Sequence, residues 1–131
     1  MSLDVPTALL ERAHLGDVSD EEFVACVRES LPYAWQTVSA VVGTLELTPG
    51  APFAQDATPP PSEVERGQLL RAFASDAIRG GLERHFGVRL AFQNCHRVAA
   101  FRPSATGSAD YRDFVSPAAQ LRNQSPELRD C

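Results

Sequence analysis

The chain contains no lysine, a single isoleucine and no run of apolar residues long enough to cross a membrane. All twelve of its basic residues are arginines. A bilayer needs about 20 consecutive apolar residues, and the amino terminus has no basic segment followed by an apolar core. We therefore expect no membrane span and no secretory signal, and we expect a cytoplasmic protein. Arginine, alanine, glycine and proline have GC-rich codons. The use of arginine without lysine, together with ten prolines, therefore also indicates a GC-rich genome.

Paired cysteines are absent as well. Cys26, Cys95 and Cys131 are scattered, and no Cys-x-x-Cys spacing typical of zinc sites occurs. An odd number of cysteines without an export signal favours reduced thiols. Thiolates are preferred ligands of zinc and of iron–sulfur clusters, so the three could converge on a metal, with His96 as a weak fourth ligand. Alternatively, they are small apolar residues or redox-active thiols.

No motif of specific enzymatic chemistry is present. The glycines near residue 80 lack the spacing and the Lys-Ser/Thr pair of a phosphate loop. Residues 94–97 place a cysteine next to a histidine, but consecutive helical residues diverge by about 100°, so on a helix they could not act as nucleophile and base. The sequence identifies no catalytic residue and favours a binding protein over an enzyme.

Charge is unevenly distributed. The net charge of −5 argues against a general nucleic-acid binder, which needs basic charge to meet phosphate, and we expect no nucleic-acid partner. Residues 1–61 carry two arginines against nine acidic residues, whereas residues 62–103 carry seven arginines against four. A basic middle third could hold an anion or an acidic partner, or it could pair with acidic residues of the same fold. The arginines concerned are Arg66, Arg71, Arg79, Arg84, Arg89 and Arg97.

Helical signals dominate the chain. Ser19 with Glu22, and Ser62 with Glu65, have the spacing of capping boxes that open helices, and Pro32 suits the first turn of another helix. From these caps and from apolar periodicity we expect helices over residues 6–14, 19–31, 32–45, 62–86, 117–123 and 126–130. The adjacent glycines 80 and 81 indicate either a kink or the close approach of another segment.

Two segments break the helical pattern. Residues 48–61 contain five prolines, which exclude a regular helix or a central strand and predict a semi-rigid loop. Residues 88–101 combine a helical spacing with a short alternation, and we favour a helix. The predicted fold is a single, mainly α domain over residues 1–131. It is a compact bundle of five to six helices with the Pro-rich loop at 48–61 and room for a minor pair of strands.

Three runs carry a family resemblance: Leu31-Pro32-Tyr33-Ala34-Trp35, Gln93-Asn94-Cys95-His96-Arg97 and Asn123-Gln124-Ser125-Pro126-Glu127-Leu128-Arg129-Asp130-Cys131. The chain resembles small actinobacterial proteins of the Streptomyces type over nearly its whole length. The resemblance implies a bacterial cytosolic protein and transfers no activity and no catalytic residues.

The leading hypothesis is a small binding or regulatory protein that holds an iron–sulfur cluster or zinc through Cys26, Cys95 and Cys131. A metal-free helical interaction module, either a homodimer or a binder of a protein partner, is the alternative. The third hypothesis is a cofactor-independent enzyme whose site is formed by residues 94–97.

Overall fold

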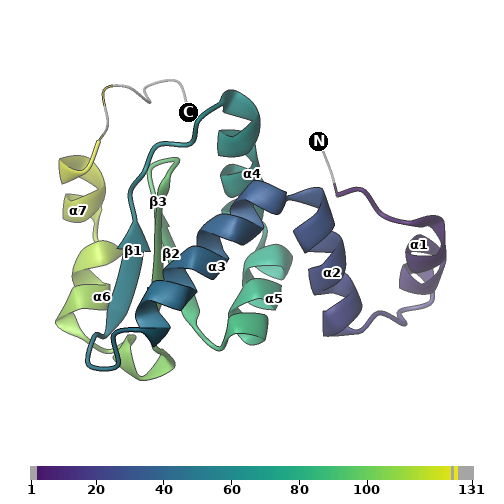
Figure 1. Ribbon diagram of the computed structural model, residues 1–131, viewed down its shortest axis with the longest axis horizontal. Helices are drawn as coiled ribbons and strands as arrows, with labels where there is room; N and C mark the ends of the chain where they lie inside the picture. The colour runs from purple at the N-terminus through teal and green to yellow at the C-terminus, as the bar shows by residue number, and fades with distance from the viewer. Residues whose placement is uncertain (1–2, 125, 127–131) are drawn as a thin grey trace.

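The computed structural model describes residues 3–124 and 126. These residues form seven α-helices, one short 3-10 helix and a three-stranded antiparallel sheet (Figure 1). The expected helical bundle is therefore wrong, because the fold is mixed, with helices in the majority. In chain order the elements are α1 (Thr7–His14), α2 (Asp20–Ser30), α3 (Pro32–Glu46), β1 (Phe53–Asp56), α4 (Glu63–Ala74), α5 (Asp76–Phe86), β2 (Arg89–Gln93), β3 (Arg97–Phe101), η1 (Pro103–Ala105), α6 (Ala109–Phe114) and α7 (Pro117–Arg122).

Three helices begin where the capping signals predict. The Glu22 N–H donates to Ser19 Oγ at 3.2 Å while Glu22 Oε1 accepts from the Ser19 N–H at 3.3 Å, which is the reciprocal capping box. Pro32 is the first residue of α3. Ser62 Oγ accepts the N–H of the third residue of α4. The end of α5 is also confirmed, since Gly87 adopts a left-handed φ of 68°.

The helix predicted over residues 62–86 is two helices. Ser75 has an extended backbone and accepts the Ile78 N–H at 3.2 Å, so it ends α4 and caps α5. Arg79 spans the break, with Nη1 donating to the Phe73 carbonyl at 3.1 Å. Local capping therefore overrides a continuous apolar periodicity.

The helix favoured over residues 88–101 is wrong, because the segment is a β-hairpin. β2 pairs with β3 in an antiparallel register that runs from Arg89 opposite Phe101 to Gln93 opposite Arg97. The polar run at 94–96 is the turn, and Asn94 there has a φ of 55°, which asparagine tolerates better than most residues. The alternation of apolar residues that begins at Val88 stops at residues 94–96 because these residues form the turn of the hairpin.

The Pro-rich segment contains a strand. β1 pairs with β3 from Phe53 opposite Phe101 to Asp56 opposite Val98. The sheet order is β1-β3-β2, which makes β1 and β2 the edge strands. Prolines next to an edge strand interrupt no ladder hydrogen bond, so the exclusion of a central strand was correct while the expectation of a plain loop missed β1.

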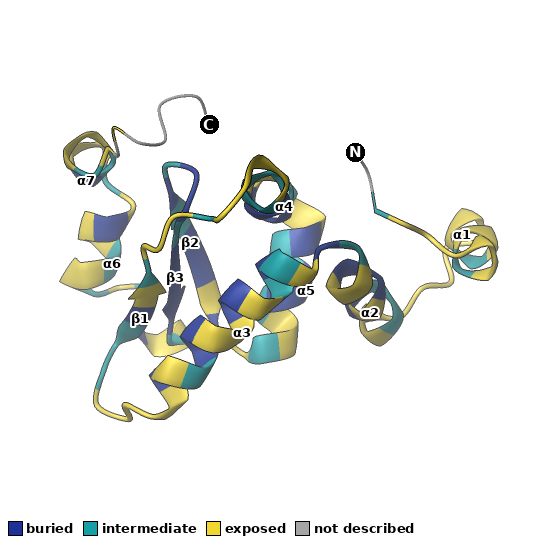
Figure 2. Cartoon of the chain, turned by 45° about the horizontal axis from the view of Figure 1, so that its top comes forward, coloured by how far each residue is buried: buried dark blue, intermediate teal, exposed yellow. Residues whose placement is uncertain are grey.

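The sheet lies between two layers of helices (Figure 2). One face, with Leu90, Val98 and Ala100, packs in the main core with α3, α4 and α5. The other face, with Ala99 and Phe101, packs against α6. β3 is buried at the centre, since residues 98–101 have no exposed surface. The outer edge of β2 therefore lies at the boundary between the two helical layers.

The two adjacent glycines of α5 have different surroundings. A Cβ at Gly81 would lie 3.1 Å from a ring carbon of Phe23 on α2, and α5 is one uninterrupted helix. Of the two expectations, close approach is therefore the one that the structure bears out. Arg84, one turn later, donates to Asp20 at 2.7 and 3.0 Å and ties α5 to the start of α2.

α1 and α7 lie at opposite ends of the molecule (Figures 1 and 2). α1 has no buried residue and stands beside α2, away from α6 and α7. α7 confirms the helix expected near 117–123, whereas the one expected over 126–130 lies outside the described residues except for Pro126. Among the described residues, no helix is both long and apolar enough to cross a membrane.

Candidate functional site

A groove of about 410 Å³ follows the outer edge of β2. We call it the edge groove. It lies where the two helical layers meet, so three parts of the chain contribute to it: the α4–α5 break, β2 and α6. Its lining residues are Phe73, Arg79, Glu83, Arg89, Leu90, Ala91, Phe92, Tyr111 and Val115.

The main chain of β2 points into this groove. In an antiparallel pair, alternate residues direct their backbone groups away from the partner strand. The Leu90 N–H is one of these, and it donates to Glu83 Oε2 at 2.8 Å. Phe92 follows two residues later and presents its backbone on the same side. Glu83 thus covers one end of an edge strand that would otherwise be open to pairing.

Two arginines give the edge groove a positive rim. Arg89 is 58% exposed and its Nε lies 3.6 Å from Glu83 Oε2, whereas Glu83 is only 14% exposed and is already bonded to the Leu90 N–H. Arg79 is held more firmly, by the Phe73 carbonyl and by Asp76 at 2.7 Å. Arg89 therefore keeps its outer donors available for a ligand, and Arg79 supplies a fixed charge.

Aromatic rings form the apolar part of the edge groove. Phe92 stacks on Phe73 with ring centroids 4.6 Å apart and an interplanar angle of 5°. Tyr111 meets Phe101 edge to face at 5.0 Å and remains half-buried. Packing fixes all three groove rings, those of Phe73, Phe92 and Tyr111, in place, so they offer rigid surfaces at little cost in side-chain entropy.

The predicted metal ligands lie on separate elements. Cys26 is a buried free thiol on α2 whose Sγ donates to the Asp4 carbonyl at 3.5 Å. Cys95 lies in the β2–β3 turn and is disulfide-bonded, whereas the sequence favoured reduced thiols. Cys131 lies outside the described residues. Among residues 3–124 and 126, no three His, Cys, Asp or Glu side chains gather as a metal site would require. The metal hypothesis stays a prediction.

His96 is buried beside Cys95, with 6% of its surface exposed. Its Nδ1 has no hydrogen-bond partner within the described part of the chain. Burial lowers the pKa of His96 below its usual range, and the charge of Arg97 lowers it further, while Asp56 opposes the shift. His96 is therefore neutral at neutral pH, which is the form a metal ligand needs but also the form a core histidine takes.

The polar run at residues 94–97 is joined to α7 by amide side chains. The Asn94 amide oxygen accepts from Gln120 at 2.6 Å and from Gln124 at 2.9 Å, and its Nδ2 donates to the Asn123 carbonyl. Asn123 in turn donates to Gln93 at 3.0 Å. These contacts give Asn94 a structural role, namely holding α7 against the hairpin.

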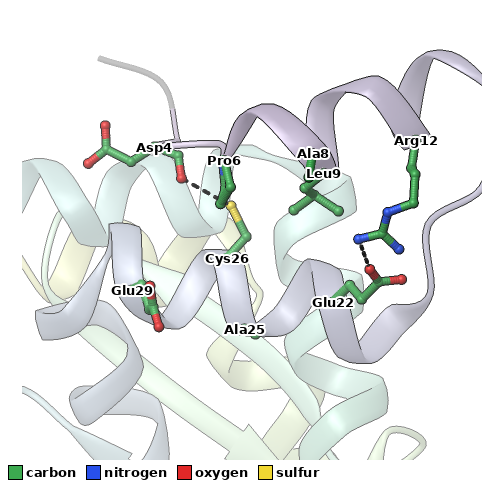
Figure 3. Close-up of a pocket in the computed structure, with 9 residues that line it drawn as sticks. All are labelled: Asp4, Pro6, Ala8, Leu9, Arg12, Glu22, Ala25, Cys26 and Glu29. Carbon is green, nitrogen blue, oxygen red and sulfur yellow. Dashed lines mark hydrogen bonds and ion pairs between the residues drawn. The ribbon is translucent and has the colours of Figure 1, made fainter.

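A second pocket, of about 300 Å³, lies between α1 and α2 (Figure 3). Ala8 and Leu9 of α1 face Ala25 and Cys26 of α2 across it, and its charged residues include the Arg12–Glu22 ion pair. Glu22 has its pKa lowered mainly by its hydrogen bond with Arg12 and further by Ser19. The pocket lies in the interface through which α1 packs on α2.

Some arginines of residues 62–103 pair with acidic residues of the same fold, and others have no such pair within the described residues, so both interpretations of the basic segment apply in part. Arg66, Arg79 and Arg89 face acidic residues of their own neighbourhood, and Arg84 pairs with α2. Arg71 and Arg97 have no carboxylate within ion-pair distance in the described chain. The sequence pointed to these arginines as a set but could not show which ones share a groove with aromatic rings, because Tyr111 comes from a helix that the sequence did not predict.

Together, the fold and the edge groove define the chain as a small α/β domain with a groove along one edge of its sheet. The chain belongs to the NucS shadow ORF family, whose model also carries the label KH and matches residues 1–131. No curated protein and no solved structure matches the chain. The match does not test the resemblance to actinobacterial proteins, which stays a prediction.

Proposed function

We propose that the chain is a non-catalytic binding module that takes a short single strand of nucleic acid into the edge groove. The observation that carries the proposal is the presence of Arg79 and Arg89 in one groove with Phe92 and Tyr111. Proteins that bind single strands combine positive charge, which follows the backbone, with aromatic rings on which the bases stack.

Each part of the groove has a role in this proposal. Arg89 meets a phosphate through its exposed guanidinium, which binds phosphate oxygens in bidentate fashion. Arg79 adds positive charge at the α4–α5 break. Tyr111 offers a ring to a base, and such a contact is worth about 1–3 kcal/mol per base.

The family label supports a nucleic-acid context, although one feature associated with it is missing. KH modules clamp the nucleic-acid backbone with a Gly-x-x-Gly loop. In this chain no two glycines are three residues apart, and α4 and α5 are joined by Ser75 alone. The proposal therefore assigns phosphate binding to side-chain guanidinium groups instead of to a glycine loop.

Net charge limits the affinity that we expect. At −5, the protein as a whole repels a polyanion, so only the local charge of the groove favours binding. Two phosphate contacts on a single strand predict a slope of about −1.4 for log K against log salt. We therefore propose a weak, salt-sensitive site for a short strand. This proposal departs from the expectation, drawn from the net charge, that nucleic acid is not a partner, and the family label supports the departure.

Fluorescence anisotropy of a labelled single-stranded oligonucleotide tests the proposal. Arg89→Gln should weaken binding and make the slope of log K against log salt less steep, by about 0.7, which is the share of one phosphate contact. Arg122→Gln is the matched control, because Arg122 is also 58% exposed and also pairs with a carboxylate, but lies on α7. Equal loss in the two variants, or no binding by the wild type at low salt, would show that the edge groove is not the site.

A further inference from the structure

The N-terminal arm, residues 3–18, carries an apolar surface that the described chain leaves uncovered. Val5, Leu10, Leu15 and Val18 are 41%, 47%, 82% and 38% exposed, and they are four of the nine large exposed hydrophobic residues of the described chain. α1 buries none of its eight residues. Isolated helices shorter than about 12 residues are marginal in water, so this helix gains stability from any partner that covers it.

The same surface is acidic. The arm itself, residues 3–18, holds three acidic residues, Asp4, Glu11 and Asp17, and one arginine, and α2 adds three acidic residues in its first turn. Arg12 pairs with Glu22 and Asp20 with Arg84, but Glu11 and Asp17 have no ion-pair partner within the described chain. These two carboxylates lie next to Leu10 and close to Leu15 in the sequence. A partner for the arm must therefore offer both apolar surface and positive charge.

The edge groove offers both. Arg79 and Arg89 form its rim, Tyr111 belongs to its wall, and Val115 beside it is 51% exposed. The arm cannot reach the groove of its own chain, because α1 lies at the opposite end of the molecule from α6 (Figures 1 and 2). Two copies placed side by side in opposite directions would bring each arm to the groove of the other.

We infer that the N-terminal arm docks in the edge groove of a second copy of the chain, in a reciprocal dimer. Such an exchange is closed by a two-fold axis and does not continue into a fibre. The carboxylates of the arm then occupy the positive rim that phosphate would occupy. The dimer itself does not depend on the proposed function. The competition does: if the edge groove binds a nucleic-acid strand, self-association and strand binding exclude each other.

Sedimentation velocity over a concentration series tests the dimer on the full chain. The wild type should shift from monomer to dimer as concentration rises, and added salt should reverse the shift because charge pairs at the interface are screened. Leu10→Glu/Leu15→Glu should stay monomeric, and so should Arg79→Gln/Arg89→Gln on the other side of the interface. Neither leucine is buried, so circular dichroism should confirm that the first variant is folded. A wild type that is monomeric throughout, or a dimer that survives either variant, overturns the inference.

Oligonucleotide binding by the arm variant separates this inference from the proposed function. If both hold, Leu10→Glu/Leu15→Glu should bind the labelled strand more tightly than the wild type at concentrations where the wild type dimerises. If the dimer behaves as expected but no variant binds the strand, the docking stands and the proposed function fails. Equal affinity of a dimeric wild type and the monomeric variant overturns the competition.

Discussion

The adjacent glycines of α5 give a pair of alanine substitutions with opposite expected effects on stability. Gly81 faces α2, and an added Cβ would lie 3.1 and 3.2 Å from two ring carbons of Phe23 and 3.8 Å from a methyl group of Val24. Gly80 points outward, and its Cβ would meet only one guanidinium nitrogen of Arg84, at 3.3 Å. That nitrogen, Nη1, is the one that does not bond Asp20, and Arg84 is 59% exposed, so the guanidinium can give the few tenths of an ångström that the contact needs while keeping its bonds to Asp20.

The magnitudes follow from two opposing terms. Alanine is favoured over glycine in a helix interior by about 1 kcal/mol, because glycine has more conformational freedom to lose. Carbon atoms pack best at about 3.5–4.0 Å, so a methyl group at Gly81 overpacks the α2–α5 contact, which costs about 1–3 kcal/mol. We expect Gly80→Ala to stabilise the protein by up to about 1 kcal/mol, and Gly81→Ala to destabilise it by about 1 kcal/mol.

Urea denaturation followed by circular dichroism measures this difference. With an m-value of about 2 kcal/mol/M, a gap of about 2 kcal/mol separates the two midpoints by about 1 M. Phe23→Leu in the Gly81→Ala background should recover part of the loss, since it removes the ring that the new methyl group meets. Equal midpoints for the two alanine variants, or a more stable Gly81→Ala, would refute the account of α2–α5 packing.

Three further predictions concern a cap, a buried histidine and the cysteines. Ser75→Ala should destabilise the protein by about 1 kcal/mol, because it removes the N-cap of α5, whereas Ser75→Asp should retain most of the stability; a urea midpoint unchanged by alanine would contradict the assigned cap. The lowered pKa of His96 means that this side chain takes up a proton at a higher pH in the unfolded chain than in the folded one. The stabilisation that neutral His96 gives the folded state is therefore complete above about pH 6.5 and is lost as the pH falls through the folded pKa. His96→Gln should therefore lose less stability than the wild type between about pH 7.5 and about pH 5, and parallel pH profiles would be the contrary result. If the metal hypothesis holds, protein purified under reducing conditions without oxygen should carry iron and sulfide, or zinc, and Cys95→Ser should lose it; identical metal content in the variant and the wild type rules out Cys95 as a ligand.

Local signals in the sequence located much of the fold. Ser19, Pro32 and Ser62 mark the starts of three helices because side-chain caps act within four residues and need no tertiary context. Gly87 ends α5 for the same reason. The break at Ser75 uses identical chemistry, but there the serine lies inside an unbroken apolar periodicity, and only the packing of α4 and α5 in different directions makes the capped turn preferable.

The sheet could not be derived in the same way. Residues 88–101 satisfy a helical and a strand pattern at once, and the choice depends on β3 being buried between two layers, which is a non-local fact. β1 was obscured by its flanking prolines, which an edge strand accepts. The edge groove depends on all of these placements, since β2, the α4–α5 break and α6 are brought together only by the sheet.

Nuclear magnetic resonance of the isotope-labelled chain, titrated with a short single-stranded oligonucleotide at low salt, tests the central claim most directly. The account predicts that the backbone amides that shift belong to β2, to the α4–α5 break and to α6 around Tyr111, and that α7 near Arg122 shifts little. Absence of shifts at saturating strand, or shifts confined to surfaces outside the edge groove, would contradict it.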